Sequence, residues 1–211
     1  MTLKRSLGCL LVLTLASGIL WAQNGPKVAH TKGSAAPTQR WNPPAGHSII
    51  WTNLGPSFTN LYNAAAGGYY VLGPSNSVGL GEQWIGLQFT PTKNVSATQL
   101  VVSVGIISGT SLVDVGLYSD AGGTVGTLLA SGHTTKIPVF GTCCGVVLVT
   151  IPSTALTNGT QYWIAATSDD TNAADFTGAF SSSNQGNIAY NPSQQGWFGF
   201  NGLVPGVAIL Q

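Results

Sequence analysis

Apolar and polar residues alternate with a period of two over much of this chain. The pattern is clearest in residues 112–132, where Val113, Val115 and Leu117 are each separated by one polar or small residue. A period of two is that of a strand with one buried face. Residues 120–123 then supply glycines that tolerate the positive φ of a tight reversal. This stretch therefore predicts a β-hairpin, around which the rest of the chain is organised.

The same pattern recurs in short segments that are separated by Gly, Pro, Asn and Ser. Further strands are expected at residues 47–54, 69–72, 82–90, 99–107, 146–151, 161–167, 175–180, 187–190, 196–200 and 204–210. After the first 22 residues, no segment combines a helical period with capping residues. Short strands at this spacing predict an all-β fold, an antiparallel β-sandwich of jelly-roll-like type. Its core is expected to bring together Val113, Val115, Leu117, Ile85, Leu87 and Val149.

The N-terminal segment, residues 1–22, is predicted to be a signal peptide. Lys4 and Arg5 precede an apolar run at residues 7–20, which has the length of a signal peptide and is short for a membrane span. Cleavage is expected after Ala22, and an uncleaved anchor is the alternative interpretation. The prediction is a secreted, extracellular or periplasmic protein that has no membrane association after cleavage.

Two regions are expected after the signal peptide. Residues 23–46 contain several prolines and glycines and almost no apolar period, which predicts a flexible linker or arm. Residues 47–211 carry the predicted strands and are long enough for a single domain with a substantial core.

The charge of the chain limits the partners that it can have. Only 6% of the residues are charged, and removal of Lys4 and Arg5 leaves five basic residues against six acidic ones. No basic patch is present to neutralise phosphates, so nucleic acid is not an expected partner. Because 44% of the residues are hydrophobic, the low charge does not indicate disorder. It indicates a surface of hydroxyl and amide groups.

Two of these segments also carry a family resemblance. Residues 112–132, LVDVGLYSDAGGTVGTLLASG, resemble the strand–turn–strand signature of secreted bacterial jelly-roll domains, and residues 156–166, LTNGTQYWIAA, are similar to their turn before a Tyr-Trp strand. With a closing strand at residues 205–210 and a Cys-Cys-Gly step, the chain resembles choice-of-anchor modules. It departs from that pattern at Val125, where Pro is commoner. The resemblance implies an exported β-sandwich and leaves its activity open.

No catalytic motif stands out. Glycoside hydrolysis needs two carboxylates that face each other across a bond, and Glu82 and Asp114 both lie on predicted strands. Acidic residues that point from a sheet into solvent give the same pattern. The sequence has no Gly-x-Ser-x-Gly elbow and no His-rich metalloprotease motif, so an enzyme is the least favoured hypothesis.

Cys143 and Cys144 are adjacent, and they are the two cysteines left once Cys9 departs with the signal peptide. An oxidising compartment favours a disulfide between them. Consecutive Cα atoms lie about 3.8 Å apart, which is closer than in most disulfides, so the bond needs a special turn. A pair of free thiols is the alternative interpretation.

Asp169, Asp170 and Asp175 form the densest group of oxygen-bearing side chains. Calcium takes six to eight oxygen ligands, and a loop between strands can supply them. The spacing is not that of an EF-hand, and an ordinary solvated loop is the alternative interpretation. No other cofactor is expected.

Aromatic residues give candidates for stacking on a sugar ring. The segment 187–202 combines aromatic and amide side chains, and Tyr69 and Tyr70 form a second aromatic pair. The candidate ligand-binding residues are Trp197, Tyr190, Gln194, Gln195, Tyr69 and Tyr70. The alternative interpretation places Trp197 in the core, where it closes one end of the sandwich.

Three hypotheses follow from the sequence. The first is a secreted non-enzymatic β-sandwich with an adhesive, structural or surface-associated role. The second is a carbohydrate-binding module that uses exposed aromatic residues, with a glycan or cell-surface polymer as partner. The third is a glycoside-active enzyme.

Overall fold

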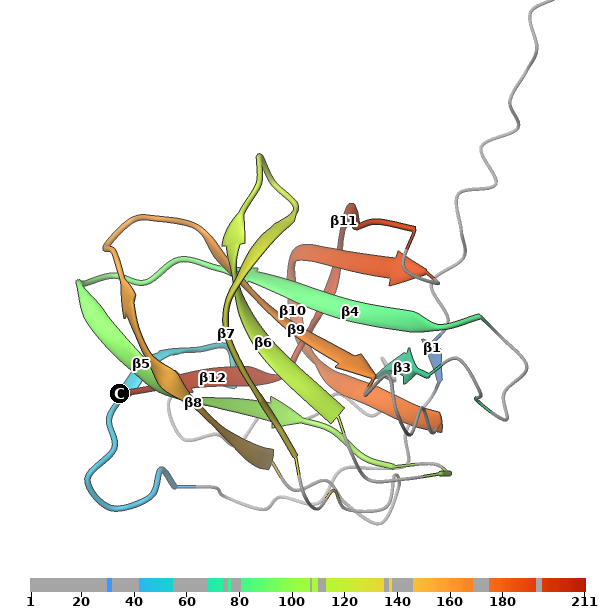
Figure 1. Ribbon diagram of the computed structural model, residues 1–211, viewed down its shortest axis with the longest axis horizontal. Helices are drawn as coiled ribbons and strands as arrows, with labels where there is room; N and C mark the ends of the chain where they lie inside the picture. Colours follow the sequence, from blue (N-terminus) through green and yellow to red (C-terminus); the bar gives the residue numbers. More distant parts are fainter. Residues whose placement is uncertain are drawn as a thin grey trace, which may run out of the picture.

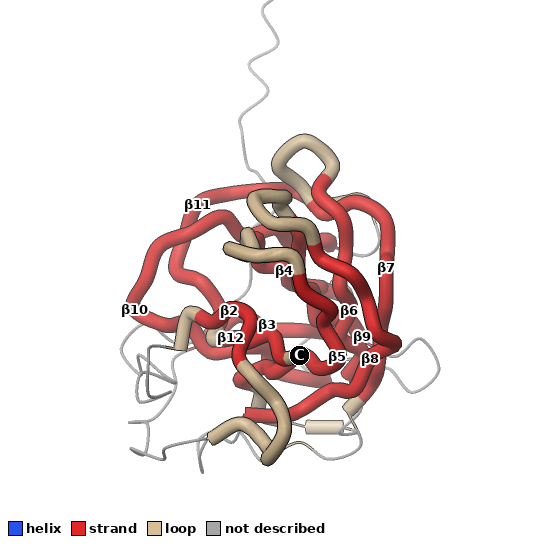
Figure 2. The backbone as a smooth tube through the Cα atoms, turned by 90° about the vertical axis from the view of Figure 1, so that its left-hand side faces the viewer, coloured by secondary structure: helices blue, strands red, loops and turns tan. Residues whose placement is uncertain are grey.

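The computed structural model shows an antiparallel β-sandwich, which confirms the predicted fold class (Figure 1). It describes residues 30–31, 42–54, 68–73, 76, 81–106, 108–109, 113–134, 137, 146–168, 175–192 and 195–211. Figure 2 draws these residues as strands and loops alone, with β10 and β11 on one side of the molecule and β7 on the other. Among them there is no helix with the length and hydropathy of a membrane span.

The strands form two sheets in which every pairing is antiparallel. The large sheet has the order β1 (His30–Thr31), β3 (Gly68–Leu72), β10 (Asp175–Pro192), β4 (Gln83–Phe89), β9 (Tyr162–Ser168), β6 (Val113–Asp120) and β7 (Val125–His133), and β11 (Phe198–Pro205) also pairs with β10. The small sheet has the order β2 (Ile49–Thr52), β12 (Val207–Leu210), β5 (Val95–Ser103) and β8 (Val146–Leu156). The chain crosses between the sheets after β1, β2, β4, β5, β7, β8 and β11.

The core lies between the two sheets and contains the apolar residues that the alternation predicts. Val113, Val115 and Leu117 are 0% exposed. They share one buried cluster with Ile85, Leu87 and Val149. The face predicted for β6 is therefore confirmed, and burial of such side chains is the main source of stability in a fold of this kind.

The predicted hairpin is also present, as β6 and β7. Gly122 and Gly123 have φ angles of 73° and 90° in its turn, a conformation that glycine adopts without steric cost. The register pairs Leu117 with Ala130 but the next residue, Tyr118, with Leu128. Residue 129 is thus an extra residue opposite β6, which makes a β-bulge in β7.

Some strand boundaries differ from the prediction. The strands expected at residues 175–180 and 187–190 are one strand, β10, because its first part pairs with β3 and its last part with both β4 and β11. The pairing of β10 with β11 has a register shift between Ser181 and Gln185, so the polar middle of β10 is irregular. Two residues of the predicted linker, His30 and Thr31, pair with β3. The predicted signal peptide lies outside the described residues.

Candidate functional site

The outer face of the large sheet carries a row of small residues that runs across four strands. The register aligns Ala189, Gly86, Ala165 and Gly116 on β10, β4, β9 and β6. A Cβ atom on Gly86 would lie 3.1 Å from Cγ2 of Val125 and 3.5 Å from the ring of Trp197. The side chains of Val125 and Trp197 therefore pack directly on this small-residue row, because glycine has no Cβ atom to hold them away.

Aromatic side chains cover the row and form a second cluster outside the sandwich core, here called the outer cluster. It consists of Val125, Trp163 and Ala189, with Tyr118 and Trp197 packed against them. Trp163 is 0% exposed there, although it lies on the face of β9 opposite the main core. The ring centroid of Trp197 lies 6.4 Å from that of Trp84 and 6.4 Å from that of Tyr118. These separations are within the range of favourable aromatic pairs. The outer cluster thus fixes the loop that carries Trp197 against the hairpin.

Asp120, at the end of β6, is the polar anchor of this cluster. Its Oδ1 accepts hydrogen bonds from Nε1 of Trp163 at 2.7 Å and from Nε2 of Gln88 at 3.0 Å, and its Oδ2 accepts one from the backbone N–H of Gly123 at 2.9 Å. Burial alone raises the pKa of Asp120, but these hydrogen bonds outweigh it and hold the pKa below the ordinary carboxyl value. The carboxylate is therefore charged and fixed in place.

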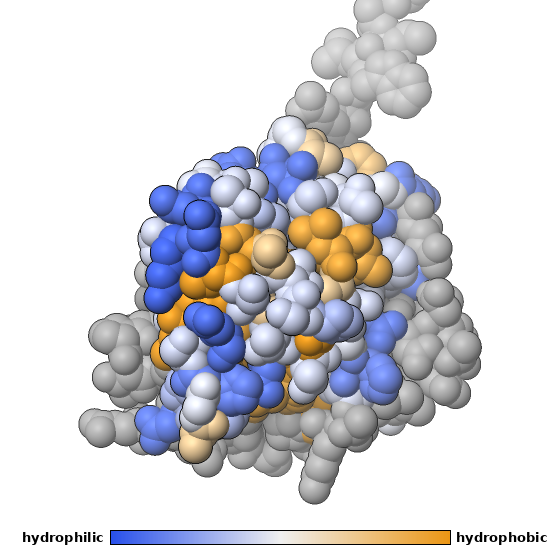
Figure 3. Space-filling view, turned by 60° about the vertical axis from the view of Figure 1, so that its left-hand side comes forward, coloured by the Kyte–Doolittle hydropathy of each residue, from blue (hydrophilic) through white to orange (hydrophobic). Residues whose placement is uncertain are grey.

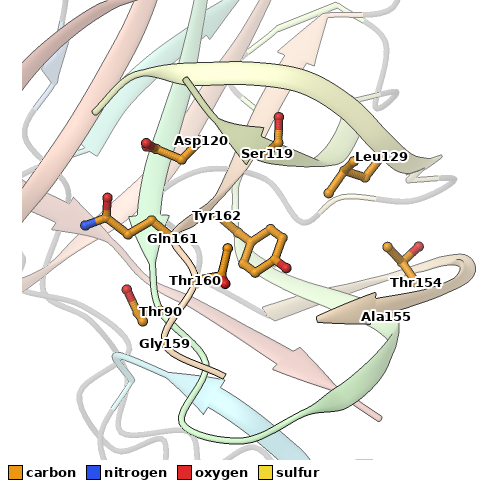
Figure 4. A pocket seen from close by; sticks show the side chains of 10 residues that line it. All are labelled: Thr90, Ser119, Asp120, Leu129, Thr154, Ala155, Gly159, Thr160, Gln161 and Tyr162. Carbon is orange, nitrogen blue, oxygen red and sulfur yellow. The ribbon is translucent and has the colours of Figure 1, made fainter. Parts of the chain in front are cut away.

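Asp120 also lines a groove at the end of the sandwich, here called the rim groove (Figure 4). The groove has a volume of about 900 Å³. Its walls come from the ends of β6 and β8 and from the middle of β7. The residues that follow β4 and those around the start of β9 complete them. The lining residues are Thr90, Ser119, Asp120, Leu129, Thr154, Ala155, Gly159, Thr160, Gln161 and Tyr162.

The groove opens because two strands of different sheets touch at one point and separate beyond it. A Cβ atom on Gly132 of β7 would lie 2.2 Å from the backbone oxygen of Thr150 on β8, so the backbones meet there. Further along, Leu129 and Thr154 stand on opposite sides of the groove. Gly132 allows β7 and β8 to touch at this point, and the groove begins where the two strands separate.

Tyr162 forms the floor of the rim groove and is held firmly. Tyr162 is 8% exposed, and its ring stacks on that of Phe89 at a centroid distance of 5.8 Å. Its hydroxyl accepts a hydrogen bond from the backbone N–H of Thr157 at 3.1 Å. In Figure 4, Asp120 and Gln161 lie on one side of this ring and Leu129 on the other. The groove thus has a rigid base, a polar side and an apolar side.

The groups that line the groove are mostly neutral. Hydroxyls of Ser and Thr dominate, with one amide, and Asp120 is the one carboxylate among these residues. Within the described part of the chain, the side chains of Thr90 and Gln161 make no hydrogen bond, so both can bind a ligand. On the face shown in Figure 3, hydrophilic and near-neutral residues likewise cover most of the coloured surface, and apolar residues form separate patches.

The structure separates the residues that the sequence proposed as a binding site. Trp197 is half-buried in the outer cluster, outside the main core, and Gln195 is exposed two residues before it. The backbone N–H of Gly196 donates to Oδ1 of Asn191 at 3.1 Å, which ties this loop to β10. Tyr190 is 6% exposed in the main core, so it presents no open ring face.

Tyr69 and Tyr70 lie on β3, which is not a groove strand. The ring of Tyr69 makes an edge contact with that of Phe200 at 6.2 Å, and burial raises the pKa of the Tyr69 hydroxyl. Both tyrosines are half-buried. They are not brought together with Trp197 in any contact of the described residues.

Several predicted site residues cannot be placed. Gln194, Asp169, Asp170, Cys143 and Cys144 lie outside the described residues. Asp175 begins β10, and its side chain is also outside the description. In the described part of the chain, no three His, Cys, Asp or Glu side chains gather as a metal site would require. The calcium site and the disulfide therefore stay predictions.

Most of the groove residues were not singled out by the sequence. Thr160 ends the turn before the strand predicted at residues 161–167 and Gln161 begins that strand, and polar residues are ordinary at such a boundary. Asp120 stands in the predicted hairpin turn, where an acidic residue needs no ligand to explain it. The signal that could have identified them is their position at strand ends, because such ends meet at one rim of a sandwich.

Comparison of the chain with protein-family models, with curated proteins and with solved structures gives no match. The functional conclusion therefore depends on the groove itself.

Proposed function

We propose that this protein is a secreted, non-enzymatic β-sandwich that binds a neutral glycan in the rim groove, and that this binding gives it an adhesive or surface-associated role. The observation that carries the proposal is the groove lining, in which uncharged hydroxyl and amide groups surround one fixed carboxylate. Its volume of about 900 Å³ is in the range of ligand-binding clefts.

The chemistry of the groove matches that of a sugar. Sugar hydroxyls can donate to Asp120 and can exchange hydrogen bonds with Thr160 and Gln161. The apolar C–H face of a sugar ring can rest against Leu129, which is 43% exposed. Charged ligands gain little here, because an anion meets the carboxylate of Asp120 and a cation meets only that one acid.

Binding without catalysis is favoured by the acids that are described. Glycoside hydrolysis uses two carboxyl groups on opposite sides of the scissile bond. Only Asp120 supplies one among the described residues that line the groove. Glu82 is 7% exposed and accepts a hydrogen bond from Nε1 of Trp84 at 3.1 Å, away from the groove lining.

Export and family remain part of the proposal. Lys4, Arg5 and the apolar run after them support secretion. The resemblance to choice-of-anchor modules supports a surface role. It rests on the strand and turn pattern of residues 112–132 and 156–166, and the β-sandwich fold is consistent with it.

The proposal is tested by titrating the purified protein with short neutral oligosaccharides. The probes are disaccharides and trisaccharides of glucose, xylose, mannose and N-acetylglucosamine, with galacturonic acid oligosaccharides as the charged comparison. We expect at least one neutral series to bind. Gln161→Ala should weaken that binding about two- to tenfold, the effect of one lost hydrogen bond.

Gln211→Ala is the matched control, because Gln211 carries an exposed amide directly after β12 and is not among the residues that line the groove. It should leave the affinity unchanged. Absence of binding to every neutral series, or preference for the galacturonic acid series, would contradict the proposed function.

A further inference from the structure

The polar side of the rim groove continues onto the outer face of the large sheet. Side chains two residues apart on a strand share a face. Gln88 therefore lies on the same side of β4 as Thr90, which follows the strand. The register places Gln88 opposite Trp163 on β9, and a side-chain hydrogen bond joins it to Asn187 on β10, next to the register pair of Ile188 with Leu87. Asn187 is in turn opposite Asn201 on β11. Gln88 on β4, Asn187 on β10 and Asn201 on β11 thus place three amides side by side on the outer face, next to the groove.

These amides, here called the amide row, are joined by hydrogen bonds that lead to the groove. Nδ2 of Asn201 donates to Oδ1 of Asn187 at 3.5 Å, and Nδ2 of Asn187 donates to Oε1 of Gln88 at 2.5 Å. Nε2 of Gln88 donates to Oδ1 of Asp120 at 3.0 Å. All three amides thus donate in the same direction, toward the carboxylate that lines the groove.

The hydrogen bonds position the amide row and leave part of its donor capacity unused. An amide side chain has two N–H donors, and each of these amides uses one of them within the described residues. Asn187 and Asn201 are exposed, and Gln88 is half-buried. The row therefore presents spare donors whose positions are fixed before a ligand arrives, which lowers the ordering cost of binding.

The spacing of the row suits a polymer. Adjacent strands lie about 4.7–4.9 Å apart, so β11, β10 and β4 repeat the amide group at regular intervals across the sheet. A linear chain of sugars repeats its hydroxyl groups at regular intervals as well. A monosaccharide in the groove could not reach Asn201, whereas a chain that leaves the groove across β4 and β10 could.

We propose that the amide row extends the rim groove into one continuous site for a linear neutral polysaccharide, which lies across the strands of the outer face. This inference rests on the proposed function, and it adds the length and direction of the ligand. Trp197 covers Gly86, one row farther along β4, and borders the path on the side away from the groove.

The test is the dependence of affinity on chain length. With disaccharides and hexasaccharides of the same neutral sugar as probes, the wild-type protein should bind the hexasaccharide about tenfold or more tightly, because several further hydrogen bonds form. Asn201→Ala should remove about two- to tenfold of hexasaccharide affinity and leave the disaccharide affinity unchanged. Asn201 ends the row, so its loss leaves the bond between Gln88 and Asp120 intact.

Asn187→Ala is the second variant and should act in the same selective way, with thermal denaturation used to verify folding. Gln211→Ala serves again as the control. Equal affinities for the two chain lengths, or hexasaccharide affinities unaffected by both Asn variants, would overturn the extended site while disaccharide binding still supports the groove. Failure of both probes to bind overturns the groove and the extended site together.

Discussion

The two faces of the large sheet are built from the same strands and have different compositions. On β6, Val115 and Leu117 face the small sheet and are 0% exposed, whereas Tyr118 faces outward and is half-buried. On β4, Leu87 belongs to the main core, whereas Gln88 makes hydrogen bonds at the outer surface. The period of two thus gives each strand one apolar face that stabilises the core and a second, outer face that carries aromatic and amide side chains.

The comparison shows how an outer face can be ordered without being a core. Small residues such as Gly86 leave room on it, and the side chains of Val125 and Trp197 fill that room. Amide and carboxylate groups then surround the aromatic rings. Substitutions on the inner face should therefore change stability, and substitutions on the outer rim should change binding.

The largest effect is expected on the inner face. Leu117→Ala removes a fully buried side chain from the main cluster and should lower the free energy of unfolding by about 2–5 kcal/mol. Chemical denaturation measures this change. A shift in the denaturation midpoint no larger than that of an exposed-residue variant would show that the face of β6 has been assigned wrongly.

A smaller effect is expected where the two sheets touch. Gly132→Ala places a Cβ atom 2.2 Å from the backbone oxygen of Thr150, so the strands must move apart. The expected cost is about 1–3 kcal/mol, as for other overpacked sites. Ser131→Ala is the control, since Ser131 is an exposed neighbour on β7. Equal thermal stability of the two variants would argue against a close contact of β7 with β8.

An effect of similar size is expected in the outer cluster. Trp163→Phe keeps an aromatic ring but removes the Nε1–H donor to the charged Asp120, and a hydrogen bond to a charged group contributes about 1.5–3 kcal/mol. The same change should raise the pKa of Asp120 toward the ordinary carboxyl value, which an NMR titration of its carboxyl group measures. An unchanged pKa in the variant would mean that the hydrogen bond has no part in lowering it.

The smallest effect is the pH dependence that Asp120 contributes. Because its pKa is lowered in the folded state, it stabilises the fold at pH values above the unfolded-state pKa of about 3.9, and this contribution is lost as the pH falls through the folded-state value. The melting temperature should therefore decline slightly less steeply below about pH 4 in Asp120→Asn than in the wild type. Parallel curves for the two proteins would contradict this.

The sequence predicted the inner face well because burial imposes a regular pattern. Val113, Val115 and Leu117 occupy alternate positions that any strand of a sandwich requires. The continuity of β10 was not predictable in the same way, since its pairing with β3, β4 and β11 depends on residues distant in sequence. Propensity alone does not determine such pairings.

The candidate site was harder to predict for a related reason. Trp197 was predicted to stack on a sugar ring; the structure places it half-buried in the outer cluster beside Trp84 and Tyr118, and its role in binding stays a prediction. Tyr190 was predicted to be a ligand platform, but the register of β10 turns it into the core. The rim groove joins residues as distant as Thr90 and Gln161, and no local pattern indicates that they converge.

The central claim is that the rim groove binds the ligand while the inner face stabilises the fold. Backbone amide shifts recorded by NMR during titration with a neutral disaccharide that binds test it most directly. The expected result is a set of concentration-dependent shifts at Thr160, Gln161 and Asp120, with no comparable shifts at Val115 or at Leu100 in the small sheet. Shifts centred on any other surface, with these groove residues unchanged, would contradict the claim.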